Sequence, residues 1–181
     1  MDTRHIIQYS RAIATIKDLP NFLYDNPKIY AYFLHQTKTN YHELIDLLKI
    51  AKKEPQLFPV LNLKDKYGRS CWGITKLSPR IILIRQNLLN GLEQAKLETT
   101  IYNTSFLLAV TILHELIHYL RIAKNLDDGQ YESGNDFERW SFGATINLDN
   151  AKTLNKYQHS FNNLKWLIKR DKNITHDYKA K

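Results

Sequence analysis

Apolar residues recur at helical spacing along the first 57 residues, and prolines interrupt this pattern at residues 19–21 and 25–27. The clearest of the resulting segments covers residues 40–53. It begins like a capping box at Asn40 and carries one continuous apolar stripe. The pattern therefore predicts a helical N-terminal part, residues 1–57, with two or three short helices.

The pattern changes between residues 58 and 86. Short runs of β-forming residues occur at 59–63, 71–75 and 80–85, and a glycine-containing turn is expected at 66–69. This stretch predicts a small β-sheet.

Helical spacing returns over residues 88–181. The longest apolar helix is expected at 106–125, followed by shorter helices at 133–142 and 151–170. Helices and strands are thus segregated along the chain, which is typical of an α+β fold. We predict a mainly helical domain over residues 1–181, with the small sheet preceding the longest helix.

The composition indicates a globular domain that has no internal disulfide. The 181 residues are 43% hydrophobic and 24% charged, as in globular domains, and the single cysteine, Cys71, excludes an internal disulfide and any site built from several thiolates. The first ten residues lack the apolar stretch of a secretory signal. The longest apolar run, at 106–113, is far shorter than the roughly 20 residues that span a bilayer, so no membrane span is expected.

The net charge is +8, and most of the excess lies in residues 151–181, which contain eight Lys and Arg against two Asp. Trp166 stands among Lys165, Lys169 and Arg170 in this segment. One alternative function is therefore a basic helical module that binds nucleic acid. The motif described next makes nucleic acid the less favoured partner.

Residues 114–118 read His-Glu-Leu-Ile-His within the longest predicted helix. Two histidines four residues apart lie on one helix face, where both can reach a single Zn²⁺ at about 2.0–2.1 Å. Glu115, beside the first ligand, can take a proton from metal-bound water. The motif predicts a zinc hydrolase site with His114 and His118 as ligands and Glu115 as general base; the alternative is a pair of core histidines bonded to neighbouring groups.

A second segment resembles the motif without completing it. Residues 41–53 match residues 113–125 at eight of thirteen positions, yet Asp46 stands where the motif has His118. Most identities fall on apolar positions that two amphipathic helices share. We therefore expect His42 and Glu43 to be surface and cap residues.

A catalytic zinc takes a third protein ligand, for which the candidates are Glu132, Asp136 and Glu138. If the chain turns back after the motif helix, a partner level with the histidines should lie several residues inside the next helix. That spacing favours Glu138 over Glu132 and places Asp136 last. Gly134, on the same face as Glu138, would allow the two helices to approach closely.

The motif, with Glu132-x-Gly134-x-x-x-Glu138 and Phe142-Gly143 downstream, resembles the zincin metallopeptidases. More narrowly, it resembles the small metallopeptidase toxin domains of bacterial polymorphic toxins and secreted effectors. The resemblance implies peptide hydrolysis at a gluzincin-like zinc site with Glu138 as third ligand. Phe142 stands where the thermolysin pattern has an Asp, so the group that orients the histidines is left open.

The same resemblance implies a protein or peptide substrate and an inhibitor or immunity protein as partner. It also implies a soluble chain, delivered by a specialised secretion system or as part of a larger secreted toxin, and otherwise cytoplasmic. Substrate peptides typically pair with an edge strand beside the active-site helix. Residues 80–85 are the candidate strand, and a buried core strand is the alternative reading of this run.

Two questions of chemistry stay open in the sequence. Tyr131, Tyr157 and His159 are candidates to stabilise the oxyanion, although packing roles are favoured for each. The same zinc site could also hydrolyse a non-peptide amide, such as a cell-wall bond, and an assay on defined substrates would separate this alternative from peptide hydrolysis.

Overall fold

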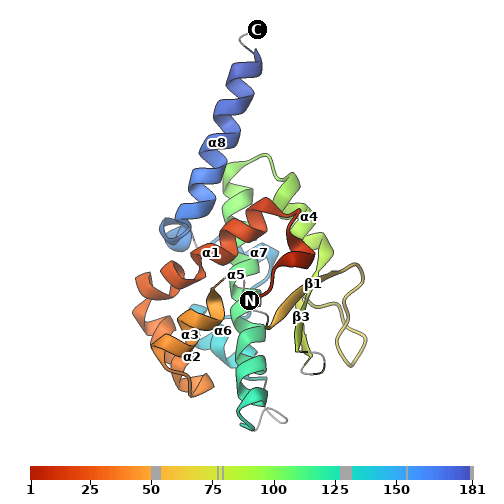
Figure 1. The fold of residues 1–181 in the computed structure, drawn as a ribbon, viewed down its shortest axis with the longest axis vertical. Coiled ribbons are helices and arrows are strands. Elements are labelled where there is room, and N and C mark those ends of the chain that lie inside the picture. Colours follow the sequence, from red (N-terminus) through yellow and green to blue (C-terminus); the bar gives the residue numbers. More distant parts are fainter. Residues whose placement is uncertain (50–53, 77, 79, 127–131, 154, 180–181) are drawn as a thin grey trace.

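The fold is known from a computed structural model, which describes residues 1–49, 54–76, 78, 80–126, 132–153 and 155–179 (Figure 1). The helices are α1 (Ser10–Asp25), α2 (Pro27–Thr37), α3 (Tyr41–Leu48), α4 (Gln86–Gln94), α5 (Glu98–Ala123), α6 (Ser133–Phe142), α7 (Leu148–Ala151) and α8 (Asn162–Lys179), with short 3-10 helices η1 (Arg4–Ile6) and η2 (Asn155–Ser160). The strands are β1 (Gln56–Val60), β2 (Gly73–Lys76) and β3 (Ile81–Arg85). This confirms the predicted mainly helical α+β fold with a small sheet before the longest helix.

Helix α5 is the centre of the molecule. Helices α1, α2, α4, α6 and α7 and strands β2 and β3 pack against it, whereas α8 packs on α1 and extends away from the body (Figure 1). By length and composition it could cross a membrane, but 72% of its most apolar stretch is buried inside the protein. A core helix of a soluble protein has this property, so the finding does not conflict with the expected lack of a membrane span. The predicted start at residue 106 was wrong: α5 begins at Glu98, because Ile101 and Tyr102 add a further turn to its buried face.

The sheet has the order β1-β3-β2, with β1 parallel and β2 antiparallel to β3. Strand β3 is therefore central, and its Ile82 and Ile84 are buried. The expectation that residues 80–85 form the substrate-binding edge was wrong, because both edges of β3 are already paired; the alternative reading as a buried core strand holds. The edge strand that packs against α5 is β2.

Of the two predicted proline breaks, one is absent and the other is present. Helix α1 continues through Pro20, since the residues around it, Leu19 and Phe22, are completely buried and hold the helix in place. The break at residues 25–27 is confirmed, with Pro27 as the first residue of α2.

The expected single helix at 151–170 is instead divided into the end of α7, η2 and α8. The cause is a contact distant in sequence: buried Asp18 of α1 accepts hydrogen bonds from the backbone N–H groups of Asn163 (2.9 Å) and Leu164 (3.0 Å) and from Asn163 Nδ2 (2.6 Å). A carboxylate at this position caps the first turn of α8 and so begins a new helix there.

We expect Asp18→Ala to lower the free energy of unfolding by about 1–3 kcal/mol, because the substitution leaves buried N–H groups without an acceptor. Burial raises the pKa of Asp18, and the hydrogen bonds from Asn163 and Leu164 partly oppose that shift. Urea unfolding measures the loss. Asp25→Ala, at the exposed end of the same helix, is the control and should change stability by less than about 0.5 kcal/mol; an equal loss in both variants would contradict a capping role.

Candidate metal centre

The two motif histidines project from the second half of α5, one turn apart. Their Nε2 atoms lie 3.2 Å from each other, and each side chain is 16% exposed. Two tetrahedral ligands about 2.0–2.1 Å from one zinc ion lie roughly 3.3 Å apart. The pair formed by His114 and His118 therefore fits a shared metal ion.

Glu138, on the buried face of α6, contacts the Nδ1 side of the His114 ring. Its Oε1 accepts a hydrogen bond from His114 Nδ1 at 2.5 Å, and its Oε2 accepts one from the backbone N–H of Ile146, also at 2.5 Å. A proton held on Nδ1 leaves the lone pair of His114 on Nε2, which faces His118. Glu138 thus fixes the tautomer and the orientation of a metal-binding histidine.

Glu132 lies on the other side of the pair, at the residue that precedes α6. Its Oε2 is 3.9 Å from His118 Nε2, and its side chain is 63% exposed. Among the described residues, His114, His118 and Glu132 form a group whose donor atoms all lie within 4.8 Å of one another. Neither Glu138 nor the exposed Asp136 belongs to that group, so the geometry ranks the candidate third ligands differently from the sequence spacing.

Glu115 lies between α5 and strand β2. The hydroxyl of Thr75 is 2.9 Å from Glu115 Oε2 and 2.7 Å from the backbone carbonyl oxygen of Glu115, whereas Glu115 Oε1 lies 4.0 Å from His114 Nε2. One carboxylate oxygen is therefore held by the sheet, and the other faces the metal-binding nitrogen. No sequence pattern indicates this role of Thr75, which is 40 residues from Glu115 in the chain.

Two glycines make room for these side chains. A Cβ atom added to Gly134 would overlap the imidazole of His114, and one added to Gly73 would lie 2.7 Å from Glu115 Cγ. The close approach at Gly134 was predicted from its position in the sequence and is confirmed. The close approach of Gly73 to Glu115 was not predicted from the sequence.

The carboxylates around His114 favour the binding of a cation at this site. Burial lowers the pKa of His114, but its hydrogen bond to Glu138 and the charges of Glu115, Glu138 and Glu132 raise that pKa, and the net pKa lies above the usual value. In the metal-free protein this interaction stabilises the fold below the ordinary histidine pKa and is lost as the pH rises through the raised pKa. A metal ion must displace the same proton, so metal binding should weaken as the pH falls.

The remaining candidates lie elsewhere or outside the described residues. Tyr131 is not among the residues described. Tyr157 stacks on Phe106 in the core, with ring centroids 5.2 Å apart, so it has a packing role. His159 is exposed, and its Nδ1–H donates a hydrogen bond to the backbone oxygen of Lys156 (2.7 Å).

The motif-like segment 41–53 has the structural role expected of it. Asn40 caps α3 by accepting a hydrogen bond from the backbone of Glu43 (3.0 Å), and the Glu43 carboxylate pairs with Lys124 at 2.9 Å. His42 is exposed against the ring of Tyr41. Residues 50–53 lie outside the described residues.

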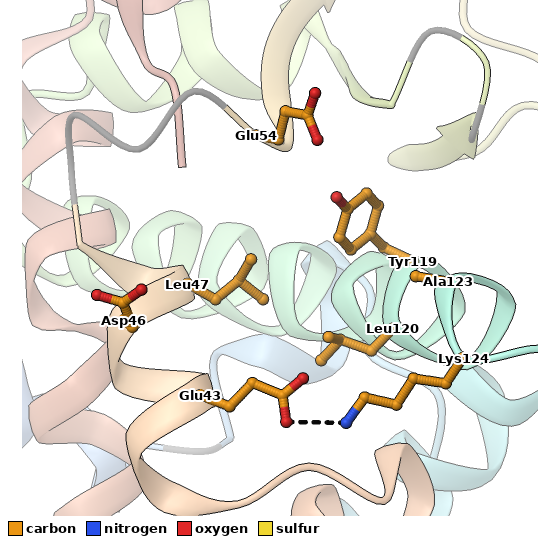
Figure 2. Close-up of a pocket in the computed structure, with 8 residues that line it drawn as sticks. All are labelled: Glu43, Asp46, Leu47, Glu54, Tyr119, Leu120, Ala123 and Lys124. Atoms are coloured by element: carbon orange, nitrogen blue, oxygen red, sulfur yellow. Dashed lines mark hydrogen bonds and ion pairs between the residues drawn. The ribbon is translucent and has the colours of Figure 1, made fainter.

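A pocket of about 320 Å³ separates this segment from α5 (Figure 2). Its wall on α5 consists of Tyr119, Leu120, Ala123 and Lys124. At about 100° per residue, this face points away from the face that carries His114 and His118. The pocket in Figure 2 is therefore separate from the metal centre.

We expect Gly134→Ala to weaken zinc binding strongly, because the added methyl group would displace the His114 imidazole. Gly91→Ala is the matched control: Gly91 is also helical, and a Cβ added there meets nothing within 4 Å. The control should bind zinc normally and gain about 0.5–1 kcal/mol of stability. Zinc titration measures the affinity of both variants. An unchanged zinc affinity of Gly134→Ala would contradict the inference that position 134 must be glycine to leave room for the His114 imidazole.

Comparison with known proteins gives one match. The model of the metallopeptidase toxin 3 family matches residues 5–143, more than three quarters of the chain. This range includes the motif on α5, Glu132 and Glu138. No match was found among curated proteins or among solved structures.

Proposed function

The chain belongs to the metallopeptidase toxin 3 family, and from this premise we propose that it is a zinc-dependent peptidase with His114, His118 and Glu132 as ligands and Glu115 as general base. The observation that carries the proposal is the 3.2 Å separation of the two Nε2 atoms, with Glu138 bonded to the far nitrogen of His114. A histidine oriented by a carboxylate is the usual arrangement around protein-bound zinc.

The donor set fits zinc by its chemistry. Two imidazole nitrogens and one carboxylate are the ligands of many catalytic zinc sites, and the fourth position stays open. A bound zinc ion supplies Lewis acidity, which polarises a carbonyl group and lowers the pKa of water toward about 7. The exposure of Glu132 keeps the site open to solvent on one side.

Glu115 carries out the proton transfers in this proposal. Its Oε2 is held by the Thr75 hydroxyl, so its Oε1, on the side of His114, is the oxygen that can accept a proton from the attacking water and pass it to the leaving amine. Gly73 and Thr75 fix this carboxylate from the strand side. The base is thus positioned by β2 and not only by its own helix.

We place the substrate along β2. This strand pairs with β3 on one side and packs against α5, so an extended peptide could add to its other edge by main-chain hydrogen bonds. Such a peptide would pass over Glu115 and the histidine pair. The family description supports a protein substrate and, for a toxin, an immunity protein as partner; delivery in or by a secreted toxin is part of the proposal.

Two measurements on one preparation test the function. Protein purified without added zinc should contain close to one zinc per chain, and it should cleave unstructured polypeptides in a reaction that a chelator stops and zinc restores. A protein that binds no zinc after reconstitution contradicts the proposal. Cleavage of cell-wall amides with no cleavage of peptides would favour the alternative amidase.

A further inference from the structure

A second pocket, of about 370 Å³, lies beside the sheet. Its wall includes Trp72, Arg85, Asn87, Thr100, Thr104 and Leu148. The volume is within the range of about 300–1,000 Å³ that is typical of ligand sites. Nothing in the proposed chemistry uses this pocket.

Arg85, the last residue of β3, gives the pocket its charge. The guanidinium lies 5.2 Å from the ring centroid of Trp72, and the buried Nε has no hydrogen-bond acceptor among the described residues. None of the ion pairs found between described residues includes Arg85. A buried donor without an acceptor is costly, so an acceptor from outside the chain would be favoured here.

Strand β2 and the residue before it extend from the metal centre to the pocket. Strand β2 runs antiparallel to α5: Thr75 contacts Glu115, Gly73 faces Glu115 and Thr111, and the pocket wall then continues with Trp72 and Thr104. The chain after α6 also reaches both places, since Ile146 bonds to Glu138 and Leu148 lines the pocket. Residues 105–113 of α5 are buried between the two places, so a bound peptide would follow the free edge of β2.

The distance between the pocket and the metal centre, measured along α5, corresponds to a few residues of substrate. Thr104 and His114 are ten residues apart on α5, which is about 15 Å at about 1.5 Å per residue. An extended peptide covers that length with about four or five residues, at about 3.3 Å each. A peptide that reaches the metal centre can therefore place one side chain in the pocket.

We propose that this pocket binds a carboxylate of the substrate and so gives the peptidase a preference for an acidic residue about four residues from the scissile bond; this inference rests on the proposed function. Among the described residues that form the pocket wall, Arg85 alone is charged, which suits a group with a single negative charge. Asn87, Thr100 and Thr104 offer further donors. The carboxylate could belong to an Asp or Glu side chain or to the C-terminus of a peptide.

The first test does not need activity. Titration of isotope-labelled protein with the α-amide of N-acetylglutamate should shift the Nε–H resonance of Arg85 saturably, while the α-amide of N-acetylglutamine, which has no carboxylate, should leave it in place. The Arg85 Nε–H resonance is assigned as the one that is missing from the spectrum of Arg85→Gln. If Arg85→Gln does not fold, Arg85→Lys is used for the same assignment. No shift with the acid, or equal shifts with both compounds, overturns the inference whether or not the protein is a peptidase.

The second test uses cleavage of a peptide library, with the cut bonds identified by mass spectrometry. Wild-type protein should enrich Asp and Glu about tenfold or more at one position three to five residues from the cut, Arg85→Gln should lose this preference, and Arg85→Glu should enrich Lys and Arg there. Enrichment only of peptides that end at that position, lost on C-terminal amidation, assigns the terminal carboxylate instead.

Arg80→Gln is the matched control, because Arg80 precedes the same strand, pairs with Glu54 at 2.7 Å and is 63% exposed. It should cleave with the wild-type preference. Cleavage with no enriched position contradicts the inference and leaves the proposed peptidase intact, whereas no cleavage at all contradicts the proposed function and leaves the pocket to the resonance test.

Discussion

Glu115→Gln is expected to lower the turnover number for peptide hydrolysis by about 10²–10⁴-fold while the protein keeps its zinc. The amide cannot accept a proton, but it still fits between α5 and β2 and can accept the hydrogen bond from Thr75. Because Glu115 is not a member of the cluster formed by the two histidines and Glu132, metal affinity should change little. Steady-state kinetics together with metal analysis measures both quantities.

The chain contains its own control for this experiment. Glu43 has the same neighbours in sequence, His42 and Leu44, but it pairs with Lys124 on a different face of the molecule. Glu43→Gln should therefore leave both turnover and zinc content unchanged. Full activity in Glu115→Gln would remove Glu115 from the mechanism, and loss of zinc in that variant would make it a structural part of the metal centre.

The elements that follow from local chemistry were predictable. Helix α6 begins and ends at the predicted residues, since its first residue is polar and Gly143 ends it with a positive φ of 85°. The capped start of α3 at Asn40 was equally visible. Both features depend on residues within a few positions of the helix end.

Elements fixed by distant contacts were not predictable. The division of the expected helix at 151–170 depends on Asp18, more than 140 residues earlier in the chain. The order of the strands also depends on pairing that no local pattern specifies, so the sequence alone does not decide whether residues 80–85 form an edge strand or a central strand. In both cases the decisive partner is far away in sequence.

The metal centre shows the same limit at the level of individual atoms. The spacing argument placed Glu138 level with the histidines, and the structure agrees: its carboxylate meets His114. Helical spacing does not specify which imidazole nitrogen a carboxylate will meet, however, and here it is Nδ1, on the side away from His118. The backbone N–H of Ile146 takes the other oxygen, a contact set by the chain beyond α6.

This geometry gives the two glutamates different expected roles. Glu138→Ala should weaken zinc binding by about 10–100-fold, the usual effect of losing a partner that orients a histidine ligand. Glu132→Ala should have a larger effect, because it removes a ligand. Competition with a chromophoric chelator at one fixed pH measures both affinities. Asp136→Ala, on the exposed side of α6, is the control and should bind zinc as the wild type does.

Conservative variants separate the two roles further. Glutamine at position 138 still offers an oxygen to His114 Nδ1, so Glu138→Gln should recover part of the affinity that Glu138→Ala loses. A neutral amide is a poor zinc ligand, so Glu132→Gln should resemble Glu132→Ala. If Glu132→Ala instead keeps its zinc, and Glu138→Ala and Glu138→Gln both lose it, then Glu138 is the third ligand. In that case the carboxylate must turn from Nδ1 of His114 toward the metal when zinc binds.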